Sequence, residues 1–173
     1  MSVQHSAQAK HAAQALPRLV LDTNVCLDLF VFDDPGVAHL RAALQGGIVV
    51  AVTNTECRDE WLRVLDYDRL GLDVVRREAA LVAYDATVGM LIPEPMASLG
   101  QGADRDTPES TLPRLPRCAD PDDQKFLQLA HGSGARWLIS RDDAVLALKR
   151  RCARDGLFAI LPPDAWTAAL IEG

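Results

Sequence analysis

The sequence has few aromatic residues, no long apolar run and no excess of basic residues. Aromatic residues make up only 5% of the 173-residue chain, so its core must be built mostly from Leu, Val and Ala. No apolar run approaches the roughly 18 to 20 residues that a membrane-spanning helix needs, so we expect no membrane segment. The hydrophobic content of 49% and the charged content of 24% are typical of a globular domain and not of a disordered chain.

Paired cysteine motifs are also missing. The four cysteines are widely scattered, at Cys26, Cys57, Cys118 and Cys152, and none belongs to a C-x-x-C pair. This spacing favours reduced, mostly structural thiols in a cytoplasmic protein over a disulfide framework or a zinc site. The N-terminal segment lacks a basic start followed by a continuous apolar stretch, so it is not typical of a signal peptide. We expect residues 1–17 to form a flexible leader.

The net charge of the chain is −6. Taken alone, this charge argues against a nonspecific nucleic-acid binder. A bound metal ion would offset several gathered acids locally, and the charge would then be compatible with a nucleic-acid substrate. The net charge therefore does not decide between these classes of protein.

Short apolar runs alternate with helical patterns along the chain. The apolar runs predict strands at 18–21, 48–52, 90–92, 137–140 and 158–161. The helical patterns predict helices beginning at 25 and spanning 37–45, 55–65, 74–89, 120–132, 144–151 and 164–171. This alternation predicts one α/β domain over residues 18–173, with a central parallel sheet in a three-layer α/β/α arrangement. Residues 94–117 are dense in Pro, Gly, Ser and Asp, which predicts a long loop or a disordered insertion.

An acidic residue stands directly after the first predicted strand. A carboxylate at the end of a buried strand must find a partner or become neutral, which makes Asp22 a candidate functional residue. Asp142 follows the predicted strand at 137–140 within two residues. Because ligands collect at the carboxyl ends of parallel strands, we expect both acids at one edge of the sheet.

Two helix-borne acids can join this edge. Helical periodicity places Glu60 on the apolar side of its helix, whereas Glu56 should face water. The same periodicity turns Asp123 inward, with Asp120 as the helix cap and Asp122 in the first turn. Four carboxylates without His or Cys favour Mg²⁺ or Mn²⁺ over zinc. Such an ion activates water and neutralises the charge that develops on a phosphate during hydrolysis.

Each of the four acids also has a purely structural interpretation. Asp22 could cap the helix that follows it, and Asp142 could be a turn or cap residue. Glu60 could be an ordinary surface acid, and Asp123 a first-turn acid beside the positive end of a helix. Independent observations nevertheless bring all four to one edge of the sheet, which favours a metal site.

Four segments carry a resemblance to a known family. They are residues 19–24 (LVLDTN), 53–65 (TNTECRDEWLRVL), 120–130 (DPDDQKFLQLA) and 137–142 (WLISRD). In these segments the chain resembles the PIN-domain ribonucleases, in particular the PIN-family toxin components of bacterial toxin–antitoxin systems. The resemblance covers roughly residues 18–163, and Arg141 stands where the family usually has Gly.

The resemblance implies a site and an activity. It implies that Asp22, Glu60, Asp123 and Asp142 are catalytic and bind Mg²⁺ or Mn²⁺, and that Asn24 and Ser140 support them by hydrogen bonds. The implied protein is a metal-dependent endoribonuclease with an RNA substrate, a cognate antitoxin and a possible homodimer.

Basic side chains should follow the backbone of an RNA strand. The candidates are Arg58, Arg63, Lys125, Arg141 and the run at 149–151, although each can equally be an ordinary solvated side chain. The alternative function is a non-catalytic PIN-like interaction module. A phosphoaspartate enzyme would need a second Asp two residues after the first, and the chain has Asn24 there.

Overall fold

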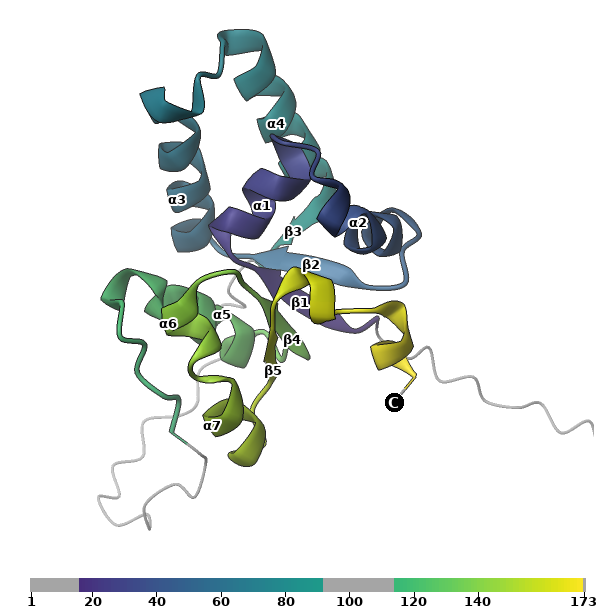
Figure 1. Cartoon of the computed structure of the whole chain (residues 1–173), viewed down its shortest axis with the longest axis vertical. Helices are drawn as coiled ribbons and strands as arrows, with labels where there is room; N and C mark the ends of the chain where they lie inside the picture. The colour runs from purple at the N-terminus through teal and green to yellow at the C-terminus, as the bar shows by residue number, and fades with distance from the viewer. Residues whose placement is uncertain (1–15, 92–113, 173) are drawn as a thin grey trace, which may run out of the picture.

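The computed structural model describes residues 16–91 and 114–172 (Figure 1). The leader predicted at 1–17 and the loop predicted at 94–117 therefore lie almost entirely outside the described residues, and the proposed domain limits stay predictions. Within the described residues, five strands form one parallel sheet in the order β3-β2-β1-β4-β5. The strands are β1 (Arg18–Leu21), β2 (Val50–Thr53), β3 (Val88–Met90), β4 (Trp137–Ile139) and β5 (Ala159–Leu161).

Helices cover both faces of this sheet (Figure 1). One face carries α1 (Thr23–Phe30), α2 (Ala38–Gln45), α3 (Thr55–Leu65) and α4 (Val74–Thr87). The other carries α5 (Gln124–Gly132), α6 (Asp143–Leu146) and α7 (Lys149–Arg154). Short 3₁₀ helices complete the chain: η1 (Pro35–Val37), η2 (Asp68–Leu70), η3 (Pro121–Asp123), η4 (Pro163–Ala165) and η5 (Ala168–Ile171). The predicted three-layer α/β/α fold with a central parallel sheet is confirmed.

The central strand β1 is buried on both faces. Leu19 and Leu21 point into a core cluster shared with α1 to α4, which includes Trp61 and which we call the α1–α4 cluster. Val20, between them, points into a second cluster that contains Phe126, here called the α5–α7 cluster. This alternation explains why the strand has a continuous apolar sequence, as strands covered on both faces do.

The second strand begins later than its apolar sequence suggests. It was predicted at 48–52, but β2 starts at Val50. The residues before it close the end of α2, where the N–H of Ile48 donates to the carbonyl of Ala43 at 3.2 Å. Gly47 has a φ of +64°, which this helix-ending motif requires and which glycine adopts without strain.

Two further boundaries differ from the prediction. The strand predicted at 90–92 is β3 at 88–90, because the buried Val88 pairs with Ala51 of β2 and ends α4 at Thr87. The helix predicted at 144–151 is two helices, α6 and α7, separated by a turn at Leu148. Lys149 therefore begins α7, and Arg151 lies in the last turn of that helix.

The predicted helix at 164–171 was wrong. Two 3₁₀ helices, η4 and η5, take its place, and Trp166 between them has an extended backbone with ψ of 131°. The Trp166 side chain is completely buried and meets the ring of Trp137 edge-on at 5.8 Å. His39 stacks on it, and His39 Nε2 donates to the carbonyl of Pro163 at 2.9 Å. Burying this one large side chain therefore interrupts the helix.

The structure also bears on the expected lack of a membrane-spanning helix and on the state of the cysteines. In this part of the chain, no helix combines the length and apolar character needed to cross a membrane. All four cysteines are free and buried.

Candidate active site

A cavity of about 390 Å³ opens at the carboxyl end of the sheet, between α1, α3 and η3. Acidic residues that line it are Asp22, Glu56, Glu60, Asp122 and Asp123. Basic residues that line it are Arg63, Arg69 and Lys125. Three of the four predicted catalytic acids therefore share one cavity, whereas Asp142 lies outside its lining.

Asp22 is the most buried of the acids, with 3% of its surface exposed. It stands at the N-cap position of α1, but its side chain makes no capping hydrogen bond. Its Oδ2 instead accepts a hydrogen bond of 2.6 Å from Oγ of the fully buried Ser140. Burial raises the pKa of Asp22, the bond from Ser140 opposes this, and the charges of Glu60 and Asp142 raise it further.

Asp142 serves partly as a helix cap. Its Oδ1 accepts the backbone N–H of Ala144 at 2.7 Å, at the start of α6. Its own N–H donates to Ser140 Oγ at 2.9 Å, so this one hydroxyl links Asp142 to Asp22. The structural interpretation of Asp142 thus holds for one of its oxygens. The charge of Asp142 still raises the pKa of both Asp22 and Asp123.

Glu60 is held by two partners. Its Oε1 accepts a hydrogen bond of 2.7 Å from Thr23 Oγ1, and its Oε2 forms an ion pair with Lys125 Nζ. Lys125 is 6% exposed, and its Nζ also donates to the carbonyl of Asp122. Burial lowers the pKa of Lys125, but the hydrogen bond and charge of Glu60, together with the charges of Cys57 and Asp123, raise it by more. Lys125 therefore remains a cation within the acidic cavity.

Among the carboxyl groups of the described residues, Asp123 has the largest shift in pKa. Burial, followed by repulsion from Asp22 and Asp142, raises its pKa from 3.8 to about 7. It follows Asp120, whose Oδ1 accepts the N–H of Asp122 and begins η3. Asp120 is thus the helix cap that the sequence predicts.

Two further polar residues, Asn24 and Glu56, are exposed at the same edge of the sheet. Asn24 is exposed and lines the cavity. A hydrogen bond from its backbone lowers the pKa of Asp22, whereas its side chain makes no hydrogen bond to the acids among the contacts of the described residues. Glu56 is exposed, as its periodicity predicts, but it also lines the cavity.

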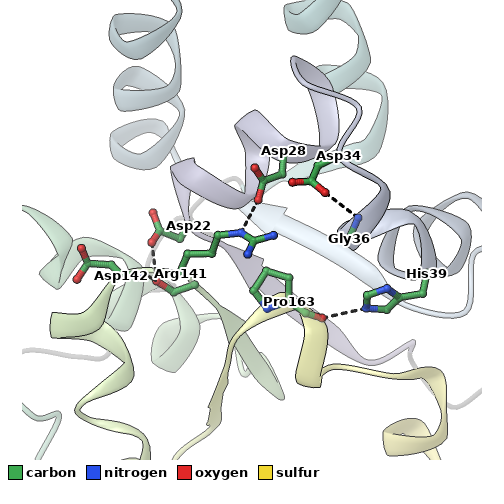
Figure 2. Close-up of polar contacts among 9 residues, drawn as sticks. Asp22, Asp28, Asp34, Gly36, His39, Arg141, Asp142 and Pro163 are labelled. Carbon is green, nitrogen blue, oxygen red and sulfur yellow. Dashed lines mark hydrogen bonds and ion pairs between the residues drawn. The ribbon is translucent and has the colours of Figure 1, made fainter.

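The predicted RNA-binding cations divide into two groups. Arg63 and Lys125 line the cavity. Arg58 is outside this lining and makes two hydrogen bonds to Asp85, at 2.9 and 2.7 Å. Figure 2 shows the Arg141 side chain reaching toward Asp28 on α1, away from Asp22 and Asp142. Arg141 Nε donates to Asp28 Oδ2 at 2.6 Å.

Sequence reasoning missed three polar residues of the cavity: Thr23, Tyr67 and Arg69. Thr23 was present in the Asp-Thr-Asn motif, but its bond to Glu60 depends on how α1 and α3 meet. Tyr67 and Arg69 follow the predicted end of the third helix, so helical periodicity could not place them. Only the turn η2 brings them to the cavity.

The chemistry of the donors fits a hard divalent ion. The cavity gathers carboxylates without His or Cys, and burial and mutual repulsion raise the pKa of Asp22 and Asp123. A cation would offset both effects. The described side chains are not arranged to coordinate an ion directly. Within residues 16–91 and 114–172, no three or more His, Cys, Asp or Glu side chains lie close enough together to hold a metal ion.

The chain is thus an α/β protein with a parallel sheet between two helical layers and carboxylates gathered at the carboxyl ends of its strands. The sequence model of the PIN domain matches residues 18–144, a span that includes all four predicted acids. The chain therefore belongs to the PIN-domain family. Proteins of this family are in general nucleases that hydrolyse phosphodiester bonds, and they typically use divalent metal ions. A search of curated proteins gives no match.

Proposed function

We propose that this protein is a metal-dependent endoribonuclease that hydrolyses RNA phosphodiester bonds and acts as the toxin of a toxin–antitoxin module. The observation that carries the proposal is the meeting of Asp22, Glu60 and Asp123 in one cavity of a PIN domain. The residues that would hold Mg²⁺ or Mn²⁺ are Asp22, Glu60, Asp123 and Asp142. When bound, the ion would activate water and neutralise charge on the phosphate.

The chain's own residues have separate roles in this proposal. Ser140 fixes Asp22 through a hydrogen bond, and Thr23 fixes Glu60 in the same way. Asp123 lines the cavity with Asp22 and Glu60, so its carboxylate is placed to hold the ion and orient the attacking water. Arg63, exposed at the cavity, is suited to contact the phosphate backbone of the RNA.

Cleavage of RNA by purified protein tests the proposal. Structured and single-stranded RNAs are incubated with Mg²⁺ or Mn²⁺, with EDTA, and with the variants Asp22→Asn and Asp123→Asn. We expect cleavage that requires metal and that each variant reduces by at least about 100-fold, the usual scale for an essential electrostatic group. Asp59→Asn is the matched control, because Asp59 is exposed on α3 and does not line the cavity. Cleavage that survives in both cavity variants would place the activity elsewhere.

A non-catalytic interaction module is the second candidate. The pairing of Glu60 with Lys125 favours it, as does the lack of a ready metal group among the described residues. Calorimetry with Mn²⁺ separates the two candidates. No Mn²⁺ binding together with no RNA cleavage would establish the module, whereas binding that Asp22→Asn abolishes would support the nuclease.

The proposed partners are an antitoxin that blocks the cavity and a second copy of the chain. A short reading frame beside the gene would supply the antitoxin, and co-expression should then suppress cleavage by the protein. Sedimentation of the purified chain tests the homodimer, which should run at twice the 18.8 kDa mass.

A further inference from the structure

The cavity changes character along α3. Glu56 and Glu60 line it near the start of the helix, and Arg63 lines it in the last turn. Tyr67 and Arg69 continue the lining beyond the helix end. On α3 itself, Glu56, Glu60 and Arg63 are three, four or seven residues apart and share one face, which runs from acidic to basic.

Tyr67 is unusual among the aromatic residues of this chain. Most of them are buried or packed against the core, but Tyr67 is 44% exposed at the cavity. The guanidinium carbon of Arg69 lies 4.7 Å from the centre of the Tyr67 ring. A cation over an aromatic face attracts the ring, and both groups are also ones on which nucleobases stack.

The turn that carries Tyr67 is held by its backbone. The N–H of Tyr67 donates to the carbonyl of Val64 at 3.0 Å, and the Tyr67 carbonyl accepts from Leu70 at 2.9 Å. Gly71 closes η2 with a φ of +58°, in the left-handed region that suits glycine. The backbone that carries the Tyr67 ring is therefore fixed before any ligand arrives, which lowers the entropic cost of binding.

The two cations beside Tyr67 are exposed. Arg63 and Arg69 both line the cavity. Arg58 and Arg141, by contrast, are paired with Asp85 and Asp28. The acidic residue before Tyr67, Asp66, forms an ion pair with Arg77, which offsets its repulsion of a phosphate. Two arginines thus line one end of a cavity whose other end is acidic, and Asp68, between Tyr67 and Arg69, lies outside the lining.

We propose that Tyr67, Arg63 and Arg69 form a nucleotide subsite in which one base of a single-stranded RNA stacks on the Tyr67 ring. Arg63 and Arg69 contact the adjacent phosphates, and the strand continues toward Asp22 and Asp123. The choice of RNA as the ligand rests on the proposed function. The subsite favours unpaired nucleotides, because a base within a duplex has no free face to offer the ring.

Binding without cleavage tests the subsite. A fluorescein-labelled single-stranded RNA and the same RNA as a duplex are titrated with full-length protein in EDTA, and anisotropy is recorded. We expect Tyr67→Ala to raise the Kd for the single strand by about 5- to 150-fold, which corresponds to the roughly 1–3 kcal/mol for stacking of one base. Tyr67→Phe, which keeps the ring, should stay within about twofold of wild type.

Two controls make the result specific. Phe32 is a matched aromatic residue, 54% exposed but outside the cavity, so Phe32→Ala should leave the Kd unchanged. Arg63→Ala and Arg69→Ala should each reduce the slope of log K against log salt by about 0.7. A Kd that Tyr67→Ala does not change would overturn the subsite, as would an equal loss in Tyr67→Phe. Wild-type protein that fails to bind the single strand would also overturn it.

Cleavage measured in parallel separates this inference from the proposed function. Metal-dependent cleavage with normal binding by Tyr67→Ala would refute the subsite and leave the nuclease intact. Binding through Tyr67 without cleavage in Mg²⁺ or Mn²⁺ would support the subsite and refute the nuclease.

Discussion

Asp123 binds its proton more tightly in the folded protein than an ordinary aspartate does. Burial and the neighbouring acids raise its pKa from 3.8 to about 7, and the same causes raise the pKa of Asp22. A carboxyl group with a raised pKa is stabilising only while it is protonated. Ionisation of these acids therefore costs the metal-free protein stability.

The first prediction concerns stability against pH. Between about pH 4 and pH 7 the folded protein retains a proton on Asp123 that the unfolded chain has released, so the free energy of unfolding falls as pH rises. Asp123→Asn removes this titration. In EDTA, its Tm relative to wild type should rise from pH 4 to pH 7 and level off above. A difference that is constant with pH, or that matches the difference for Asp59→Asn, would contradict the prediction.

The second prediction concerns the buried cation of the cavity. Lys125→Met leaves Glu60 without its ionic partner, and breaking a buried pair costs about 3–5 kcal/mol. The Glu60 side chain is 18% exposed, so we expect the lower end of that range in denaturant unfolding. Mn²⁺ should recover more stability in this variant than in wild type, because the ion supplies the missing charge. Lys149→Met, at an exposed lysine, is the control and should change neither quantity.

At the scale of single residues, sequence reasoning placed some acids better than their partners. Periodicity brought Glu60 and Asp123 to the side of the cavity because their helices are regular and amphipathic. It could not show that Lys125 reaches back to Glu60, since that contact depends on where α5 sits beside α3. Nor could it show that one carboxylate oxygen of Asp142 accepts a hydrogen bond from the N-terminus of α6.

Helices and strands were predicted well where a pattern ran without interruption. β1 was predicted with its observed limits, and α3 closely, because an apolar run and a capped amphipathic helix are local signals. The limits of β3 depend on its pairing with β2, which is a contact between distant segments. The C-terminal segment depends on the burial of Trp166 against Trp137 and His39. No local sequence pattern predicts the pairing of β3 with β2 or the burial of Trp166.

The third prediction uses two glycines with open space around them. Apart from their own chain neighbours and, for Gly132, the backbone of its own helix, no atom lies within 4 Å of a β-carbon placed at Gly47 or at Gly132, so neither substitution causes a clash. They differ in backbone conformation, because Gly47 has a φ of +64° and Gly132 lies at the end of α5. Gly47→Ala should destabilise by about 1–2 kcal/mol. Gly132→Ala should be neutral or stabilise by up to about 1 kcal/mol.

Equilibrium unfolding in urea measures both glycine variants. Because the two sites have equally open surroundings, a difference in the sign of their effects reports backbone strain alone. Equal destabilisation by both alanines would show that the turn after α2 does not require the left-handed conformation.

The arrangement of the whole molecule links metal binding to folding. The proposed ligands come from the residue after β1, from α3, from η3 and from the segment after β4, so an ion that joins them would tie together parts distant in sequence. Because the unfolded chain cannot gather these groups, the ion should bind the folded state preferentially.

The fourth prediction is a rise in Tm with Mn²⁺. At an ion concentration of 100 times the Kd, the stabilisation is about 2.7 kcal/mol. For a domain of this size that corresponds to a shift of about 5 to 10 °C. Asp22→Asn should remove most of the shift, whereas Asp59→Asn should retain it. A shift of equal size in Asp22→Asn would mean that Mn²⁺ acts elsewhere on the protein.

The buried tryptophans all lie on one side of the sheet, so their fluorescence reports on that side. All three, Trp61, Trp137 and Trp166, belong to the α1–α4 cluster, on one face of the sheet. Intrinsic tryptophan emission will therefore report the loosening of that layer and remain largely insensitive to α5, α6 and α7. Far-UV circular dichroism records the helices of both layers. Unfolding curves from the two methods will coincide only if the layers on the two faces of the sheet come apart together.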